Sequence, residues 1–306
     1  MKNTAISTFE LFKMFPDKES ARVHMEKLRW PNGPVCPACG EAKRIGSRRP
    51  EYYCCNACLL DFTVRTNSIF ERSHIPLHKW LYAMYLLVTA RKGISSMQLS
   101  KEIGVTQKSA WFMLGRIREA CGNDLTKLSG TIEIDETYVG GKEKNKHANK
   151  KVAGRGTVGK SAVIGMRERG GRTKAMPIEV ADVNTVYNTV TKNVETKSFL
   201  NTDEASGYER LDGLFYSRQS VNHGNKEYVR GNVHTNGIES VWAVLKRGLN
   251  GVYHHVEKKH LARYVNEFTF RLNDGNVERT TDQRITSLLA ASVGKRLTFE
   301  ELTKVV

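Results

Sequence analysis

The sequence predicts a mixed α/β domain that is preceded by two smaller units. Three observations support this prediction. Five of the six cysteines lie between residues 36 and 58, apolar residues then recur at helical three- and four-residue steps, and from Thr131 onward the pattern changes to the alternation of a β-strand. We therefore expect an N-terminal unit over residues 1–70, a helical unit over 71–128 and the α/β domain over 129–306.

The composition indicates a protein that binds a polyanion. The 306 residues include 48 Lys and Arg against 32 Asp and Glu, which gives a formal net charge of +16, more than solubility requires. A hydrophobic fraction of 40% with 26% charged residues excludes a wholly disordered or collagen-like chain.

The sequence also predicts a cytoplasmic protein without a membrane partner. Its longest nearly uncharged apolar stretch, residues 80–90, is shorter than the roughly 20 residues that cross a bilayer. The first residues include Glu10 and lack the apolar core and cleavage site of a signal peptide. The cytoplasm is a reducing compartment, so we interpret the clustered cysteines as metal ligands or free thiols in preference to disulfides.

The cysteine cluster has the spacing of a zinc ribbon. Cys36 and Cys39 form one Cys-x2-Cys pair, and Cys55 and Cys58 form a second. So short a span cannot assemble a core, so bound Zn²⁺ would supply its folding free energy. Cys54 lacks the pair spacing, and the alternative for the whole cluster is a group of free structural cysteines.

A short helix is expected before the ribbon, over about 18–30, and an apolar helix after it, from Pro76 to Gly93. The next residues predict a helix-turn-helix. Ser95 or Ser96 can cap its first helix, Gly104 allows the turn and Thr106 can cap the second helix. Such hairpins also occur without a nucleic-acid role, but the positive charge favours DNA. The side chains expected to contact DNA are those of Gln107, Lys108, Trp111 and Arg116.

The α/β domain is read from its periodicity. Strands are expected over 131–139, 161–170, 174–183, 198–203 and 216–223, with helices that begin near Asn184 and Asn236. The glycine-rich segment 140–160 holds seven basic residues against one acid. We expect it to contact the phosphate backbone of DNA, through Lys150, Lys151 and Arg155, rather than to be only a solvated linker.

Three carboxylates stand out by their positions in these elements. Asp135 lies in the first strand, Asp203 ends the fourth, and Glu239 lies in the first turns of the helix that starts near Asn236. If the first and fourth strands are neighbours, these side chains meet and repel one another unless cations bind between them. Oxygen ligands suit Mg²⁺ or Mn²⁺, and two such ions support in-line phosphoryl transfer.

Four segments give the chain a resemblance to a known family. LRWPNGPVCPACG, IEIDETYVGGK, LNTDEASGY and HTNGIESVWAVLKRG resemble segments of bacterial insertion-sequence DDE transposases that have an N-terminal zinc ribbon and an ISXO-like DDE domain. The resemblance extends from about Phe9 to Asn273. It implies an RNase H-like catalytic fold, with Asp135, Asp203 and Glu239 as the catalytic acids and magnesium ligands.

The resemblance further implies that Lys246, two helical turns after Glu239, contacts transposon-end DNA. Some relatives use an asparagine as the third metal-side residue, which leaves Asn236 as the alternative to Glu239.

The function implied is DNA transposition: recognition of terminal inverted repeats, Mg²⁺-dependent strand cleavage and strand transfer, by a homodimer or larger assembly on nucleoid DNA. Two alternatives stay open. One is an RNase H-like nuclease that does not transpose, and the other is a zinc-ribbon DNA-binding regulator with an inactive α/β domain. The presence of all three acids disfavours the regulator.

Overall fold

The computed structural model describes residues 5–122, 126–141, 147–150, 156–203, 206–221, 229–274 and 279–304. The chain forms two compact units. The first contains residues 1–123 together with 274–306, and the second contains residues 124–273.

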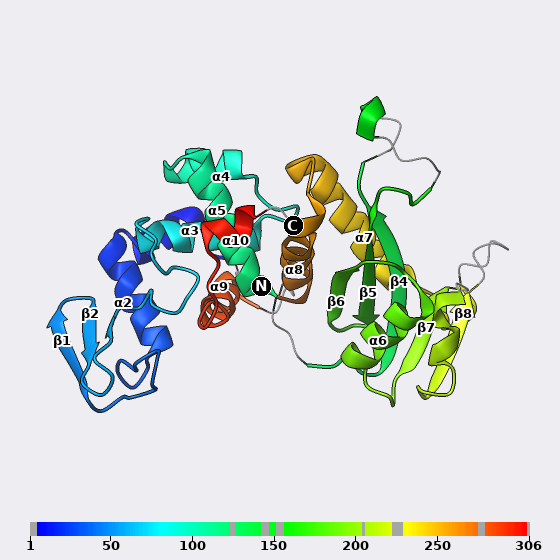
Figure 1. The fold of residues 1–306 in the computed structure, drawn as a ribbon, viewed down its shortest axis with the longest axis horizontal. Coiled ribbons are helices and arrows are strands. Elements are labelled where there is room, and N and C mark those ends of the chain that lie inside the picture. The colour runs from blue at the N-terminus through cyan, green and yellow to red at the C-terminus, as the bar shows by residue number, and fades with distance from the viewer. Residues whose placement is uncertain are drawn as a thin grey trace. The chain divides into compact units, whose positions relative to one another are not determined.

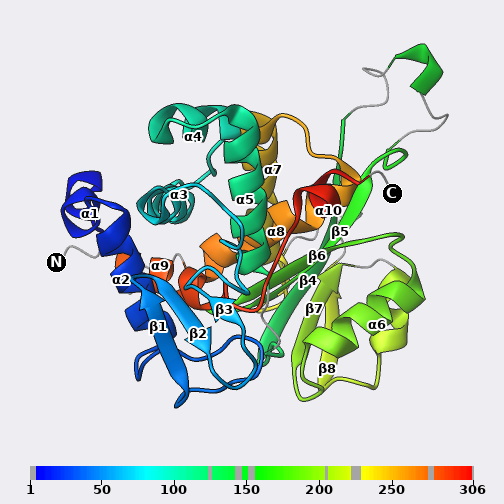
Figure 2. The same ribbon diagram turned by 60° about the vertical axis from the view of Figure 1, so that its left-hand side comes forward.

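The first unit consists of a small antiparallel sheet and a set of helices (Figure 2). The sheet has the order β1-β2-β3. Its elements are α1 (Thr8–Met14), α2 (Lys18–Arg29), β1 (Ile45–Arg49), β2 (Tyr52–Cys55), β3 (Asp61–Phe62), α3 (Leu77–Thr89), α4 (Ser96–Ile103), α5 (Gln107–Cys121), α9 (Thr281–Ala290) and α10 (Phe299–Thr303).

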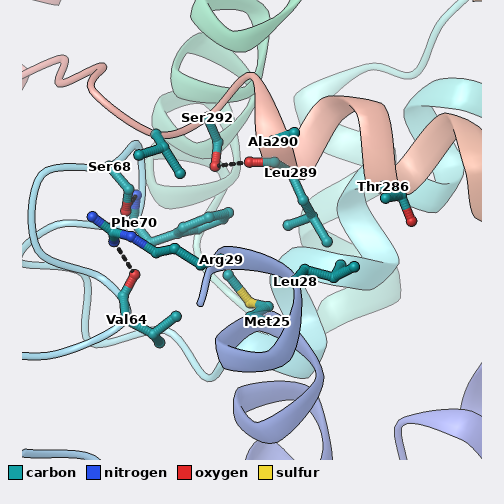
Figure 3. A pocket seen from close by; sticks show the side chains of 11 residues that line it. Met25, Leu28, Arg29, Val64, Ser68, Phe70, Thr286, Leu289, Ala290 and Ser292 are labelled. Atoms are coloured by element: carbon teal, nitrogen blue, oxygen red, sulfur yellow. Dashed lines mark hydrogen bonds between the residues drawn. The ribbon is translucent and has the colours of Figure 1, made fainter. Parts of the chain in front are cut away.

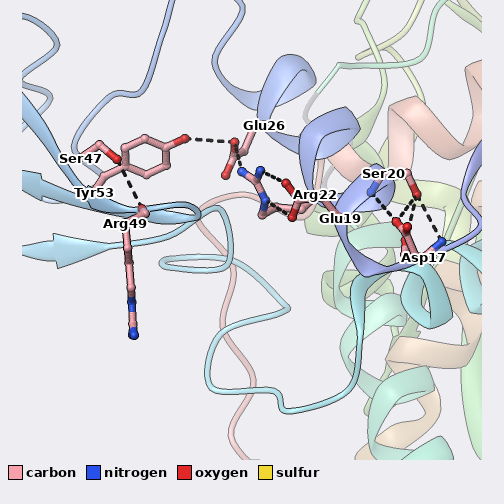
Figure 4. A network of polar contacts seen from close by, with 8 residues as sticks. All are labelled: Asp17, Glu19, Ser20, Arg22, Glu26, Ser47, Arg49 and Tyr53. Atoms are coloured by element: carbon pink, nitrogen blue, oxygen red, sulfur yellow. Dashed lines mark hydrogen bonds and ion pairs between the residues drawn. The ribbon is translucent and has the colours of Figure 1, made fainter.

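A polar network joins the small sheet to α2 (Figure 4). The Tyr53 hydroxyl donates a hydrogen bond to Glu26 Oε2 at 3.0 Å. Arg22, 9% exposed, bridges Glu19 and Glu26 on the same helix. The ring of Tyr53 packs against that of Trp30, directly after α2. The sheet is therefore fixed to its neighbouring helix by both polar and aromatic contacts.

The helix-turn-helix forms as the sequence predicts. Ser95 caps α4 and Thr106 caps α5, each accepting a backbone N–H three residues on. Gly104 adopts the left-handed conformation, with φ of 63°, that ends α4.

The C-terminal residues differ from the predicted division, which assigned all of 129–306 to the α/β domain. Residues 274–306 instead belong to the first unit. The reason is apolar burial: Ile285, Leu289 and Leu302 are at most 5% exposed, and α9 and α10 pack on α5.

The second unit is a five-stranded mixed sheet with helices on both faces (Figure 1). The strand order is β6-β5-β4-β7-β8. The β4–β5 and β5–β6 pairs are antiparallel, and the β4–β7 and β7–β8 pairs are parallel. The elements are β4 (Thr131–Val139), the 3₁₀ turn η2 (Ala148–Lys150), β5 (Ser161–Glu168), β6 (Thr173–Ile178), α6 (Val183–Asn193), β7 (Phe199–Asp203), the 3₁₀ turn η3 (Ser206–Leu211), β8 (Ser217–Val221), α7 (Asn236–Gly248), the π-helical turn η5 (Leu249–Tyr253) and α8 (Lys258–Asp274).

Two apolar cores cover the two faces of this sheet. Ile132 and Ile134 of β4 pack with α6 and η3 on one face, and Val163 of β5 packs with α7 and α8 on the other. Because side chains alternate along a strand, the odd-numbered residues of β4 face α7. Helix α6 begins one residue before Asn184, capped by Asp182.

The α7 helix approaches the sheet closely at Gly165. A Cβ added there would lie 2.5 Å from Cζ2 of Trp242 and 2.8 Å from Cδ1 of Ile238. Both atoms belong to buried side chains of α7 that cannot move without shifting the helix. Glycine is thus required for the distance between α7 and β5.

Replacing this glycine tests the close approach. We expect Gly165→Ala to destabilise the protein by about 1–3 kcal/mol, because overpacking forces α7 away from the sheet. Urea unfolding followed by circular dichroism measures the change. Gly141→Ala is the control, since a Cβ there meets no atom within 4 Å. Equal stabilities for the two variants would contradict the argument.

Candidate active site and metal centre

Two aspartates lie side by side at the centre of the mixed sheet. The parallel register pairs Ile132 with Leu200 and Glu133 with Asn201. Asp135 and Asp203 each lie two residues further along their strands, and the charge of Asp203 acts on Asp135. The aspartates of the sequence prediction are therefore brought together by the β4–β7 pairing.

The carboxylate of Asp135 is held in place by two donors. The indole Nε1 of Trp242 donates to Oδ2 at 3.0 Å, and the backbone N–H of Glu136 donates to Oδ1 at 2.8 Å. Burial and the negative charge of Asp203, with a smaller effect of Glu239, raise the pKa of Asp135 to about 6 against these hydrogen bonds. A raised pKa means that the cluster lacks compensating positive charge, which a bound cation would supply.

Glu239 joins this group from helix α7. It lies in the first turn of α7, is exposed, and its charge contributes to the raised pKa of Asp135. Thr235 Oγ1 lies 3.5 Å from Glu239 Oε1. Asn236 is the first residue of the helix and is also exposed. Lys246 is exposed in the last turn of the same helix, two turns beyond Glu239.

A further acid, Glu136, was not among the residues predicted from the sequence. Burial, followed by the charges of Asp203 and Asp135, raises its pKa to about 7, although an interaction with the Tyr208 hydroxyl lowers it. Tyr208 is fully buried in the core on the α6 side. The alternation of β4 places Glu136 on that side, opposite to Asp135. Its position next to Asp135 in the sequence was the signal available.

The residues expected to bind DNA in the helix-turn-helix separate into two groups. Gln107 and Lys108 are exposed in the first turn of α5, and Trp111 is half-buried. The amide of Gln107 donates to Ser96 Oγ at 2.8 Å, and Lys108 Nζ lies 4.6 Å from the ring centre of Phe299. These side chains remain accessible to a ligand.

The prediction that Arg116 contacts DNA is wrong. Arg116 is 7% exposed, and its guanidinium donates to three backbone carbonyls, those of Leu297 at 3.0 Å, Ile69 at 2.9 Å and Glu71 at 2.8 Å. The C-terminal residues cover this part of α5 and turn Arg116 into an interior hydrogen-bond donor. Of the basic loop residues, Lys151, Arg155 and the side chain of Lys150 lie outside the described residues.

Four cysteines converge at the ribbon. The sulfurs of Cys36, Cys39, Cys55 and Cys58 all lie within 4.8 Å of one another, with Cys36–Cys58 and Cys39–Cys55 distances of 3.6 Å. Four thiolates on a tetrahedral Zn²⁺, with Zn–S of about 2.3 Å, are about 3.8 Å apart. The cluster therefore fits zinc.

The thiols of the ribbon differ in how readily they ionise. The Leu60 N–H lowers the pKa of Cys58, but burial and the neighbouring thiols outweigh it and raise the pKa to about 12. Burial raises the pKa of Cys36, but the N–H groups of Cys39 and Ala38 and the neighbouring thiols outweigh it, giving a pKa of about 7. Cys54 is not part of the cluster; its sulfur accepts from Arg48 Nη2 at 3.7 Å.

Comparisons with known proteins agree with this geometry. Residues 127–273 match the ISXO2-like transposase domain, and residues 16–60 match the transposase zinc-ribbon domain. An uncharacterized protein in transposable element ISH50 of Halobacterium salinarum is 31% identical over 273 residues, which cover 85% of this chain and 92% of that protein. The chain belongs to the ISXO2-like transposase family.

The sheet of this transposase has the mixed α/β fold that the sequence predicts. Two solved structures are also similar. A chain of the simian T-cell lymphotropic virus intasome in complex with PP2A regulatory subunit B56 gamma has 14% identity and a TM-score of 0.30, with 66% of this chain and 72% of that chain covered. A chain of the Mos1 strand transfer complex has 10% identity and a TM-score of 0.20, with coverage of 69% and 78%.

An apolar groove in the first unit offers no alternative active site (Figure 3). Its walls come from α2, from residues 64–70 after β3, and from α9 with the residues that follow it. Among the described residues that line it, Arg29 is the one charged side chain, and it donates to the Val64 carbonyl at 2.6 Å. No carboxylate, histidine or cysteine lines it. Among the described residues of the transposase, no helix is both long and apolar enough to cross a membrane.

Substitutions of Arg116 and Gln107 in the transposase should have opposite effects on stability and on DNA-sequence preference. We expect Arg116→Met to lower the free energy of unfolding by about 3 kcal/mol, because it leaves three buried carbonyls without their donor. Gln107→Ala should change stability by less than about 0.5 kcal/mol and alter DNA-sequence preference instead. Chemical unfolding and competition binding with varied DNA sequences measure the two effects. A folded, fully stable Arg116→Met protein with altered sequence preference would restore Arg116 as a DNA contact.

The ribbon predicts about one zinc ion per chain of the transposase. Cys39→Ser should lose the metal and the ordered structure of the ribbon, since three thiolates no longer complete the tetrahedron. Cys54→Ser is the matched control and should keep the zinc. Elemental analysis of freshly purified, reduced protein measures the content. Loss of zinc in Cys54→Ser would show that the ligand set is wrong.

Proposed function

We propose that this transposase recognises the terminal inverted repeats of an insertion sequence, cleaves the DNA strand at each end and transfers the strand to target DNA. The observation that carries the proposal is the buried Asp135 carboxylate, which feels the negative charge of Asp203 and, more weakly, that of Glu239. Burial and mutual repulsion raise the pKa of Asp135, the mark of a site suited to cations.

The three acids would hold divalent metal, Mg²⁺ or Mn²⁺, in this proposal. Their carboxylate oxygens are the ligands that these ions prefer. When bound, a pair of such ions activates the attacking oxygen and stabilises the leaving oxygen of a phosphodiester.

The remaining residues orient the acids and the DNA. Trp242 fixes the Asp135 carboxylate through its indole N–H, and because it lies on α7 it couples the position of Asp135 to that of Glu239. Lys246, on the exposed side of the same helix, would contact the phosphates of the transposon end. Arg116 has no place in this interface.

DNA recognition is assigned to the first unit. The first turn of α5 presents Gln107 and Lys108, the positions from which a recognition helix reads base edges in the major groove. The zinc ribbon supplies a second contact with the terminal repeat. The net charge of +16 gives the sequence-independent part of the affinity. Since two ends must be joined, the active form is a homodimer or larger assembly.

Removing any one acid should abolish catalysis and spare binding. Asp135→Ala, Asp203→Ala and Glu239→Ala are each expected to eliminate Mg²⁺-dependent cleavage and joining of terminal-repeat DNA, because the ions are held jointly. Affinity for the DNA ends should change little. Glu195→Ala is the control, an exposed acid of the same domain.

The same assay decides whether Glu239 or Asn236 is the third catalytic residue. It also separates transposition from the nuclease and regulator alternatives. Glu239→Gln should damage cleavage at least as much as Asn236→Ala, since an amide does not offset the charge of a cation. Normal cleavage by Glu239→Gln with an inactive Asn236→Ala would transfer the role to Asn236. Cleavage without strand transfer would indicate the nuclease, and specific binding without cleavage the regulator.

A further inference from the structure

Glu133 is a buried carboxylate on β4 that the proposed mechanism does not use. It is 2% exposed and lies two residues before Asp135, on the same face of the sheet. Burying a carboxylate is costly unless partners compensate its charge. The partners of Glu133 therefore show what the residue does.

These partners come from the turn directly after β5 and from the residues around the start of α7. Arg169 Nε donates to Glu133 Oε1 at 3.0 Å, and His234 Nδ1 lies 3.3 Å from the same oxygen. The backbone N–H of Ile238 donates to Oε2 at 3.0 Å. Both carboxylate oxygens thus have donors.

Glu133 acts as a helix cap from another element. Ile238 is the third residue of α7, and the first N–H groups of a helix have no partner within it. The N-cap residue, Thr235, makes no side-chain capping bond. A carboxylate from β4 takes that role, and its charge also interacts favourably with the helix dipole.

Arg167 and Arg169 also bind the residues at the start of α7. Arg169 Nη2 donates to the His234 carbonyl at 3.2 Å, and Arg167 Nη1 donates to the Gly237 carbonyl at 3.3 Å. A Cβ on Gly237 would lie 2.6 Å from Glu133 Oε2, so the helix start comes this close only with glycine there.

We propose that Glu133 is a positioning residue of the active site. Through Arg169 and the Ile238 N–H it fixes the first turn of α7 on β4. Glu239 directly follows Ile238, and Asp135 lies two residues from Glu133, so one carboxylate sets the separation of two acids. The inference rests on the proposed function, and it assigns Glu133 no direct contact with metal.

Glu133→Gln and Gly237→Ala test the attachment from its two sides. The first removes the charge but keeps an acceptor for Ile238, and the second displaces the carboxylate without changing any charge. We expect each to lower the cleavage rate about 10- to 100-fold, the usual loss on removing a partner that orients metal ligands, and to raise the Mn²⁺ concentration for half-maximal cleavage. Excess Mn²⁺ should restore part of the rate, and affinity for end DNA should stay unchanged.

Further variants separate positioning from general destabilisation. Arg169→Met should match Glu133→Gln, and the double variant should lose no more than either single variant, because the pair acts as a unit. The control is Gly251→Ala. Gly251 lies just beyond the C-terminal end of α7, and a Cβ added there has no atom within 4 Å. Circular dichroism first shows that each variant is folded at the assay temperature. A variant that unfolds is replaced by Arg169→Lys, which keeps the positive charge but loses the planar guanidinium group.

Mn²⁺ binding to the protein without DNA, measured by electron paramagnetic resonance, completes the test, with Asp135→Ala as the reference. Weakened but detectable Mn²⁺ binding in Glu133→Gln supports positioning. Folded Glu133→Gln and Gly237→Ala proteins with wild-type Mn²⁺ dependence would overturn it. So would a loss of Mn²⁺ binding as complete as in Asp135→Ala, which would make Glu133 a ligand. If Asp135→Ala itself binds Mn²⁺ and cleaves normally, the proposed function fails, and the role of Glu133 with it.

Discussion

The close packing of helix α7 on the mixed sheet is the constraint on which the rest of the site depends. Asp135 and Asp203 repel each other, and their adjacency has to be imposed by the fold. The pairing of β4 with β7 imposes it. Apolar contacts then hold α7, which carries Glu239, on the sheet: Trp242 and Ile238 fill the space that Gly165 leaves open. The same Trp242 donates to Asp135, so a single side chain both stabilises the packing and orients the carboxylate.

Buried charge refines this apolar packing. Apolar contacts hold α7 on the sheet but tolerate small shifts of the helix along its axis, whereas a hydrogen bond to one N–H of the first turn does not. Glu133 makes that bond, and Arg169 compensates its charge. The ribbon uses a comparable combination: Tyr53 and Trp30 pack, while Glu26 and Arg22 fix the sheet to α2.

The sequence predicted those features that depend on local pattern. The cysteine spacing identified the four sulfurs that converge. The alternation along the chain also predicted the two strands that carry Asp135 and Asp203, and these strands pair. Features set by distant contacts were missed. Arg116 has the spacing of an exposed DNA contact, but a segment about 180 residues later in the chain covers it and supplies the Leu297 carbonyl. Glu133 resembles an ordinary acid on a polar strand face, because its partners lie 36 and 105 residues away.

The charge distribution gives the acids and the basic surface complementary roles. A chain with a net charge of +16 attracts DNA, yet the acidic cluster at the strand ends would repel a phosphodiester that entered it. Burial, together with the charges of the neighbouring acids, raises the pKa values of Asp135 and Glu136. In the proposed function, cations held by the cluster would reverse its sign, close to where negative charge develops during phosphoryl transfer. Metal binding would then serve DNA recognition at the scissile phosphate as well as catalysis.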